Sequence, residues 1–255
     1  MARLARTTLG LESLTDRITP AVTVTTGDDG VVTVRCDQWA NDVDITDNGA
    51  AGVTVTVDGV DQEIPTDVTT LKVYTRAGHD TVDFALGENV TGTTRTVEVW
   101  LGNGHDTFTA DLAGGLDAAS DLTLKVDGGN GKDTLTAVGG GAVAGNLTVE
   151  FKGNNGMDNL SYEFAGTVTG VFDLTLHGGN GVDTIRGNLD VQAGSTGTVT
   201  AEVLGRNGKD DLGLWVTGDG VAGLSTESLF SIHGGNGRDL FAHSDNVTVL
   251  DPWKK

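Results

Sequence analysis

Apolar and polar positions alternate along this chain with a period of two, which is typical of β-strands that bury one face. The alternation is clearest in seven segments, where two apolar positions flank a mostly polar one. The first apolar position holds Leu71, Val97, Leu124, Val149, Leu174, Ala201 and Phe230, and the second holds Val73, Val99, Val126, Phe151, Leu176, Val203 and Ile232. We therefore predict seven strands, each with one face turned towards a core.

A turn motif of eight residues begins two residues after the second apolar position of each segment. The copy at residues 128–135 has the sequence Gly-Gly-Asn-Gly-Lys-Asp-Thr-Leu. In all seven copies position four is glycine, position six is aspartate and position eight is apolar. The seven aspartates are Asp80, Asp106, Asp133, Asp158, Asp183, Asp210 and Asp239. Each motif predicts a glycine turn that leads into a second strand.

The motif returns after about 26 residues, and a repeat of this length indicates stacked units with a shared core. We predict an all-β chain that forms a parallel β-solenoid, or β-helix, in which equivalent positions stack about 4.8 Å apart. An antiparallel β meander or sandwich, with the same strands joined by hairpins, is the alternative. It is less favoured because a meander gives no reason for seven turns to keep one sequence.

The repeats occupy residues 71–245, and segments without the full motif flank them. Residues 21–70 alternate like strands around Asp/Gly and Asn/Gly turns, so we predict hairpins that form a cap or an atypical first coil. Residues 246–255 are predicted to form a last strand and a tail. Residues 1–20 are interpreted as a leader or tail.

The composition narrows the classes of partner. The chain has 36 acidic and 16 basic residues and a formal net charge of −20. Nucleic acids require a basic surface, so this balance argues against nucleic acid and for a cation as partner. No apolar run approaches the roughly 18 residues of a membrane-spanning helix. The single cysteine, Cys36, cannot form an intrachain disulfide.

The repeated turn resembles the RTX, or hemolysin-type, calcium-binding repeat, whose nonapeptide is G-G-x-G-x-D-x-U-x with U a large apolar residue. The copies that begin at Gly128, Gly178 and Gly234 match every fixed position. The resemblance implies that turns of neighbouring coils share calcium ions, and calcium prefers six to eight oxygen ligands of this kind. The ligands it implies are Asp106, Gly128, Asn130, Asp133, Gly153, Asn155, Asp158, Gly178, Asn180, Asp183, Asp210 and Asp239.

Two features differ from the RTX pattern. The motifs are not contiguous, and position five holds cations such as Lys132, Lys209 and Arg238 where RTX repeats often have Asn or Asp. The alternative to calcium is that each aspartate only caps its turn through backbone N–H groups. However, carboxylates stacked 4.8 Å apart repel each other by about 0.9 kcal/mol even at the dielectric constant of bulk water. We therefore expect positive charge beside the aspartates.

Other metal candidates are weaker. His79 and His105 hold position five in adjacent copies, but two ligands make a poor transition-metal site, and stacked histidines are favoured. Asp42, Asp44 and Asp47 superficially suggest an EF-hand loop, which would need glycine at its sixth position and glutamate at its twelfth, and both are missing.

The amino end of the chain carries a second resemblance. Residues 11–17, followed by Pro20, resemble the LExLEDR leader found at the amino ends of many planctomycete proteins, with Thr15 in place of the second glutamate. The resemblance implies export, and hence an extracellular or cell-surface location.

No nucleophile–base pair, phosphate loop or zinc spacing stands out, and we predict that the chain is not an enzyme. Its predicted function is that of an exported calcium-binding β-solenoid, structural or associated with a cell surface or matrix. Its expected partners are calcium ions and a surface or matrix glycan or protein. The alternatives are a calcium-independent protein- or glycan-binding module, with Trp100 and Trp215 as sugar-stacking candidates, and a carbohydrate-active β-helix enzyme.

Overall fold

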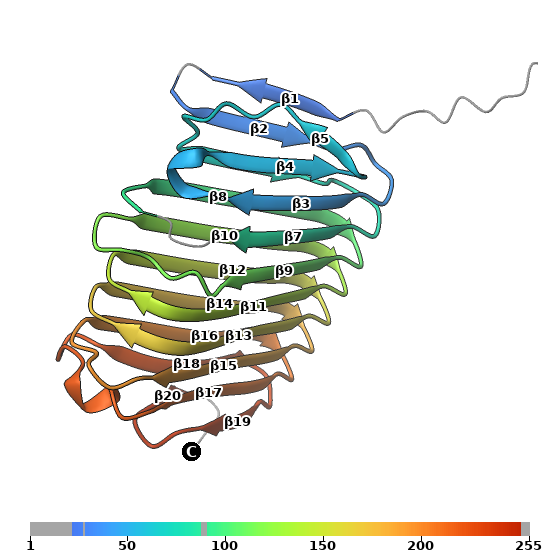
Figure 1. The fold of residues 1–255 in the computed structure, drawn as a ribbon. Helices are drawn as coiled ribbons and strands as arrows, with labels where there is room; N and C mark the ends of the chain where they lie inside the picture. The colour runs from blue at the N-terminus through green and yellow to red at the C-terminus, as the bar shows by residue number, and fades with distance from the viewer. Residues whose placement is uncertain (1–21, 28, 88–90, 251–255) are drawn as a thin grey trace, which may run out of the picture.

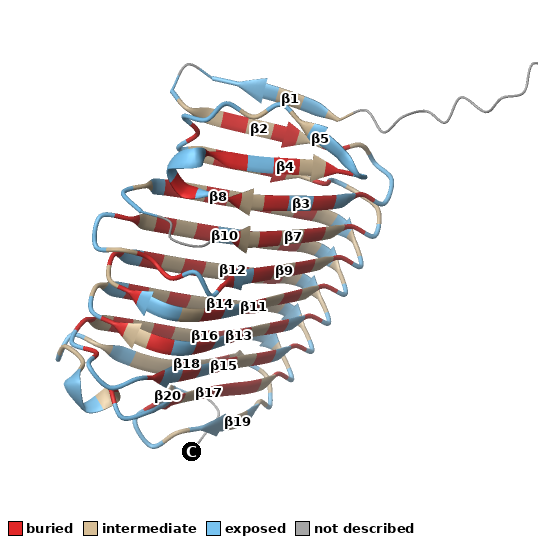
Figure 2. Cartoon of the chain, viewed as in Figure 1, coloured by how far each residue is buried: buried red, intermediate tan, exposed pale blue. Residues whose placement is uncertain are grey.

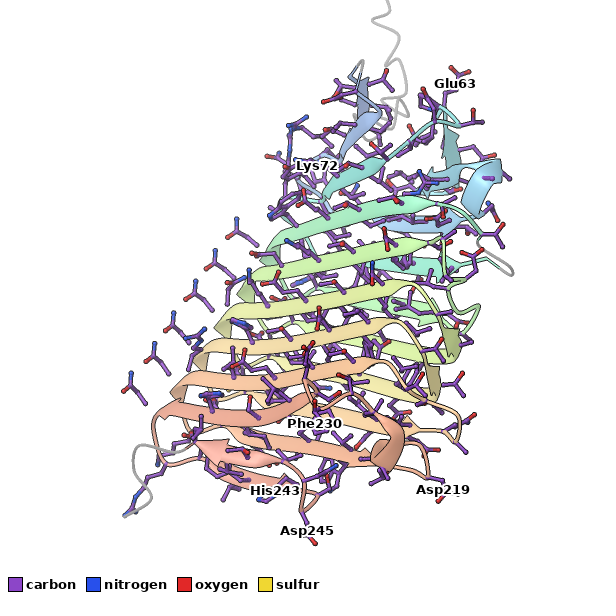
Figure 3. The ribbon with its side chains drawn as sticks, turned by 90° about the vertical axis from the view of Figure 1, so that its left-hand side faces the viewer. Glu63, Lys72, Asp219, Phe230, His243 and Asp245 are labelled. Carbon is purple, nitrogen blue, oxygen red and sulfur yellow. The ribbon has the colours of Figure 1, made fainter. Side chains whose placement is uncertain are left out.

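The chain forms a β-solenoid in a computed structural model that describes residues 22–27, 29–87 and 91–250. About 65% of the chain is strand, and the stacked coils make about six turns, about 27 residues apart. The coils follow one another from the N-terminal end to the opposite end (Figure 1). Lys72 and Glu63 lie at the N-terminal end of the stack, and Asp219, Phe230 and His243 lie at the other (Figure 3). The predicted leader, residues 1–20, and the end of the predicted tail, residues 251–255, lie outside the described residues.

Two ten-stranded sheets, here called sheet A and sheet B, form the walls of the solenoid. In their order across sheet A, the strands are β1 (Thr23–Thr26), β2 (Val31–Arg35), β6 (Thr70–Tyr74), β8 (Thr94–Gly104), β10 (Asp121–Gly131), β12 (Asn146–Gly156), β14 (Val171–Gly181), β16 (Thr198–Gly208), β18 (Leu229–Asn236) and β20 (Thr248–Leu250). Across sheet B they are β19 (Leu240–His243), β17 (Asp211–Thr217), β15 (Thr184–Val191), β13 (Asn159–Val168), β11 (Thr134–Val143), β9 (Thr107–Leu112), β7 (Thr81–Leu86), β3 (Asp42–Asp47), β4 (Val53–Val57) and β5 (Val60–Gln62). Short 3-10 helices cover Gly49–Ala51 (η1) and Val221–Gly223 (η2).

Strands of the repeat region pair in parallel, one coil on the next. Gly131 at the end of β10 is in register with Gly104 of β8 and with Gly156 of β12, so the repeated turns stack directly on one another. In sheet B, Leu135 aligns with Phe108 and Leu160 in the same way. The predicted parallel solenoid is therefore confirmed, and the antiparallel alternative is wrong for this region.

The apolar positions of the alternating pattern are buried in one core, and Figure 2 shows buried and less buried residues alternating along the strands. Of the fourteen predicted core positions before the turns, thirteen are fully buried, and Phe230, near the C-terminal end, is partly buried. The rings of Phe108 and Phe151 pack edge to face with centroids 5.6 Å apart. One continuous core therefore runs along the solenoid axis, as the repeat length predicts.

The N-terminal segment combines both kinds of pairing. Strands β2 and β3 are parallel to β6 and β7 and so form a first coil. Antiparallel pairs β1–β2, β3–β4 and β4–β5 add hairpins to this coil. A buried ion pair fastens the segment to the repeats, because Arg95 Nε of β8 lies 3.0 Å from Asp47 Oδ2 of β3. No helix among the described residues is long and apolar enough to cross a membrane.

Candidate functional site in the repeated turns

The glycine at position four of each turn is required by the close stacking of coils. A Cβ atom added to Gly156 would lie 1.4 Å from the carbonyl oxygen of Gly131 in the preceding coil, and the φ angle of Gly156 is 151°. Gly131, Gly181, Gly208 and Gly237 are as closely packed, with distances of 1.4 to 1.6 Å. The invariance of position four therefore has a steric cause that involves no ligand.

The aspartates at position six form a continuous hydrogen-bonded column along one edge of the solenoid. The Oδ1 atom of each aspartate accepts a hydrogen bond from the backbone N–H of the aspartate one coil before it, at 2.8 to 2.9 Å. Asn41 takes the place of the aspartate in the first coil, and its N–H donates to Asp80 Oδ1 at 2.8 Å. We call Asp80, Asp106, Asp133, Asp158, Asp183, Asp210 and Asp239 the aspartate column.

The second carboxylate oxygen of every aspartate in the column is buried. Each Oδ2 has no hydrogen-bond partner among the residues that the structure describes. In the last five copies, Oδ2 lies close to the glycine at position one of the same turn. A Cβ atom added to that glycine would be 2.4 to 2.7 Å from Oδ2. A buried charged oxygen without a partner is costly, so protonation or a bound cation would stabilise these atoms.

Burial raises the pKa of the carboxyl groups of Asp80, Asp106, Asp133, Asp158, Asp183 and Asp210. The pKa of Asp158 rises from 3.8 to about 7, chiefly by loss of hydration and further through the charges of Asp133 and Asp183, while the N–H of Asp133 opposes the rise. The pKa values of Asp133 and Asp210 rise to about 6 for the same main reason. Those of Asp80, Asp106 and Asp183 are also raised by burial. Burial therefore makes these carboxyl groups easier to protonate than exposed aspartates.

The asparagines at position three form a separate ladder on the exposed side of the turn. Each Nδ2 donates to the Oδ1 of the preceding asparagine at 2.7 to 2.8 Å, along Asn103, Asn130, Asn155, Asn180, Asn207 and Asn236. These side chains are largely exposed, whereas Asp133, Asp158 and Asp183 are buried. The structure thus brings the predicted ligands Gly128, Gly153 and Gly178 to the aspartates, but not the side chains of Asn130, Asn155 and Asn180.

The residues at position five also point away from the column. Lys132, Lys209 and Arg238 are exposed, and none forms an ion pair with the aspartates in the part of the chain that the structure describes. The rings of His79 and His105 stack with centroids 5.1 Å apart. The Nδ1 atoms of these two rings accept the backbone N–H groups of His105 and Lys132, at 2.8 Å each. Among the described residues, position five therefore forms no ion pair with the aspartate column.

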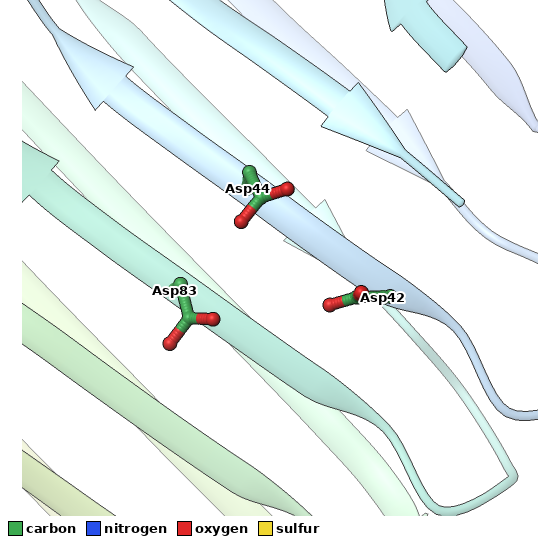
Figure 4. A group of neighbouring side chains, drawn as sticks. All are labelled: Asp42, Asp44 and Asp83. Carbon is green, nitrogen blue, oxygen red and sulfur yellow. The ribbon is translucent and has the colours of Figure 1, made fainter. Parts of the chain in front are cut away.

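A second acidic group lies on the outer face of sheet B. Carboxylate oxygens of Asp42, Asp44 and Asp83 lie within 4.8 Å of one another (Figure 4). The sequence places Asp42 and Asp44 together, but Asp83 joins them only because β3 and β7 are parallel neighbours with Asp44 opposite Asp83. A signal for this pairing is present in the sequence. Asp44 follows Asn41 by three residues, and Asp83 follows Asp80 by three residues, so the two aspartates occupy equivalent positions in adjacent coils.

Comparison of the chain with protein-family models, curated proteins and solved structures gives no match.

Proposed function

We propose that this chain is a non-enzymatic calcium-binding β-solenoid, in which calcium neutralises the aspartate column and completes the fold of an exported structural or surface protein. The observation that carries the proposal is the row of buried Oδ2 atoms without partners. Carboxylate oxygens are the hard ligands that calcium prefers. Stacked carboxylates also repel one another. A divalent cation would neutralise their charge and give the Oδ2 atoms a partner.

The residues present fit this chemistry in part. The carboxylates of Asp106, Asp133, Asp158, Asp183 and Asp210, with oxygens of the glycine turns, would hold the ions. The amides of Asn130, Asn155 and Asn180 are excluded from our ligand set because they bond to each other on the exposed side. Bound calcium would supply charge neutralisation and cross-links between coils, and this chain's own residues would supply the stacked turns.

A location outside the cell would agree with the same proposal. Calcium sites in extracellular modules are weak, with dissociation constants of roughly 0.1 to 1 mM, and are filled because extracellular calcium is abundant. A ligand that binds only the folded turns stabilises the fold by mass action. The net charge of −20 and the resemblance of residues 11–17 to an export leader agree with this location.

The test is thermal unfolding of the full chain at pH 8 in EGTA, in 5 mM magnesium and in 5 mM calcium. We expect the melting temperature to rise with calcium and far less with magnesium, which dehydrates reluctantly and demands octahedral geometry. Isothermal titration calorimetry then counts the ions bound per chain.

A matched pair of variants locates the sites. Asp158→Asn keeps an acceptor for the N–H of Asp133 but removes one carboxylate from the column. We expect it to reduce both the calcium stoichiometry and the calcium-dependent rise in melting temperature. Asp219→Asn removes the same charge from an exposed position and should respond like the wild type. Equal melting temperatures of the wild type in EGTA and calcium at pH 8 would refute the proposal and leave protons as the partners of the column.

A further inference from the structure

A short stack of rings stands on the outer face of sheet A, on the side away from the core. Arg35, Tyr74 and Trp100 occupy equivalent positions on the neighbouring strands β2, β6 and β8. The Tyr74 and Trp100 rings are parallel, with an angle of 2° between their planes and centroids 4.4 Å apart. The guanidinium carbon of Arg35 lies 5.0 Å from the centroid of Tyr74 on this ladder. One face of Trp100 is therefore covered by Tyr74.

The other face of Trp100 borders a small hollow. The next residues of the same row are Asp127 on β10 and Lys152 on β12. Because the side chain of Asp127 is short, it does not continue the stack of rings. A hollow of about 100 Å³ results, and its walls include Trp100, Asp127, Lys152, Glu98, Lys125 and Glu150. This space suits one ring-sized group and is smaller than the roughly 300 Å³ at which drug-sized pockets begin.

The polar groups around the hollow balance in charge. Glu98 pairs with Lys72 at 3.3 Å, and Glu150 pairs with Lys152 at 2.7 Å and with Lys125 at 3.9 Å. Asp127 accepts a hydrogen bond from Asn154 Nδ2 at 2.6 Å. Three carboxylates and two ammonium groups line the hollow, and the ammonium group of Lys72, which pairs with Glu98 from outside it, brings the local sum to zero in a chain whose net charge is −20. The local chemistry therefore favours a neutral ligand that both donates and accepts hydrogen bonds.

We propose that this hollow is a carbohydrate subsite that takes one neutral pyranose ring, stacked on the free face of Trp100. A pyranose whose hydroxyl groups are all equatorial, as in β-linked glucose or xylose units, presents an apolar C–H face to an aromatic ring. Its hydroxyl groups at the rim then donate to Asp127 and Glu98 and accept from Lys125 and Lys152. The ligand ring takes the place in the ladder that a third aromatic side chain would fill.

The test follows the indole N–H signals of the full chain by NMR, in EGTA and in calcium, so that its result does not depend on the proposed ion. The chain has four tryptophans, and Trp100→Phe assigns the relevant signal. Cellohexaose and xylohexaose are titrated to 20 mM. We expect the Trp100 signal to shift with saturation in the millimolar range, while the signal of Trp215, on the opposite sheet, stays in place.

Variants separate stacking from other contacts. Trp100→Ala should weaken binding about tenfold or more, the loss that corresponds to one aromatic contact of about 1.4 kcal/mol. Trp100→Phe should retain part of the affinity. Asp127→Trp fills the hollow with a ring and should abolish binding while the circular dichroism spectrum stays that of the folded chain. Trp215→Ala is the matched control and should bind normally.

Three results would overturn the proposal. They are an unshifted Trp100 signal with both sugars, full affinity in Trp100→Ala, and a shift caused by arginine amide but by neither sugar. The last result would identify a site for cations on the tryptophan face instead.

Discussion

Replacing Gly156 by alanine tests whether the stacked turns, apart from any ion, hold the coils together. The added Cβ would lie 1.4 Å from the carbonyl oxygen of Gly131, so the two coils must separate by well over an ångström at this turn. Alanine would also have to adopt a φ of 151°, a conformation that L side chains rarely take.

The expected cost follows from the contacts that this separation breaks. Three hydrogen bonds of 2.8 Å join the coils beside Gly156: Asp133 N to Asp158 Oδ1, Asn155 Nδ2 to Asn130 Oδ1, and Asn159 N to Asp133 O. Each contributes about 1 kcal/mol net to the free energy of unfolding. The strained backbone adds roughly 1 to 3 kcal/mol. We therefore expect Gly156→Ala to lower the free energy of unfolding by about 4 to 6 kcal/mol.

The assay is urea unfolding in EGTA, followed by circular dichroism. Gly194→Ala is the matched control, because Gly194 also has a positive φ, 95°, but nothing lies within 4 Å of its added Cβ. Gly194→Ala should lower the free energy of unfolding only through its strained backbone, by roughly 1 to 2 kcal/mol. Equal losses in the two variants would refute the argument that close stacking fixes the glycine at position four.

Three more measurements test other features. In EGTA we expect the free energy of unfolding to fall as the pH rises from about 4 to about 7. The reason is that burial raises the pKa of Asp158 from 3.8 to about 7, so its carboxyl group binds a proton more tightly in the folded chain than in the unfolded chain. A rise in the free energy of unfolding over that range, measured by urea titration, would contradict this prediction. Tyr162→Phe should raise the free energy of unfolding by about 1 kcal/mol, since the buried hydroxyl has no partner among the described residues, and a lower melting temperature would count against it. Arg95→Ala should lower the free energy of unfolding by about 3 to 5 kcal/mol, because it leaves the buried Asp47 carboxylate without its charged partner, and a double variant with Asp47→Ala should lose less than the two single losses added.

The repeat pattern predicts most of the fold because each strand carries the same information about burial. Positions such as Leu124 and Val126 face the core in every coil, and the spacing of the turns fixes the parallel register. Arg95 is the exception, since the same position holds Leu122 in the next coil and nothing nearby in the sequence indicates its partner. That partner, Asp47, is 48 residues earlier.

The direction of the turn side chains is harder to predict. Asn130 and Asp133 are three residues apart, yet the first is exposed and the second is buried. This division depends on the positive φ values of Gly129 and Gly131, the two residues on either side of Asn130, which change the direction of the chain there. Similarly, Lys132 is close to Asp133 in the sequence but points into solvent. The calcium ligands remain a prediction, now confined to the aspartates and the oxygens of the glycine turns.

The hydrogen bonds of the aspartate column also have a direction along the chain. Each aspartate binds the N–H of the coil before it, so a coil is completed only when the following one has arrived. During synthesis the antiparallel hairpins β1–β2, β3–β4 and β4–β5 emerge before the repeats and can form from local contacts. We therefore expect later coils to add to this template in the order of synthesis, each addition completing the hydrogen bonds of the coil made just before.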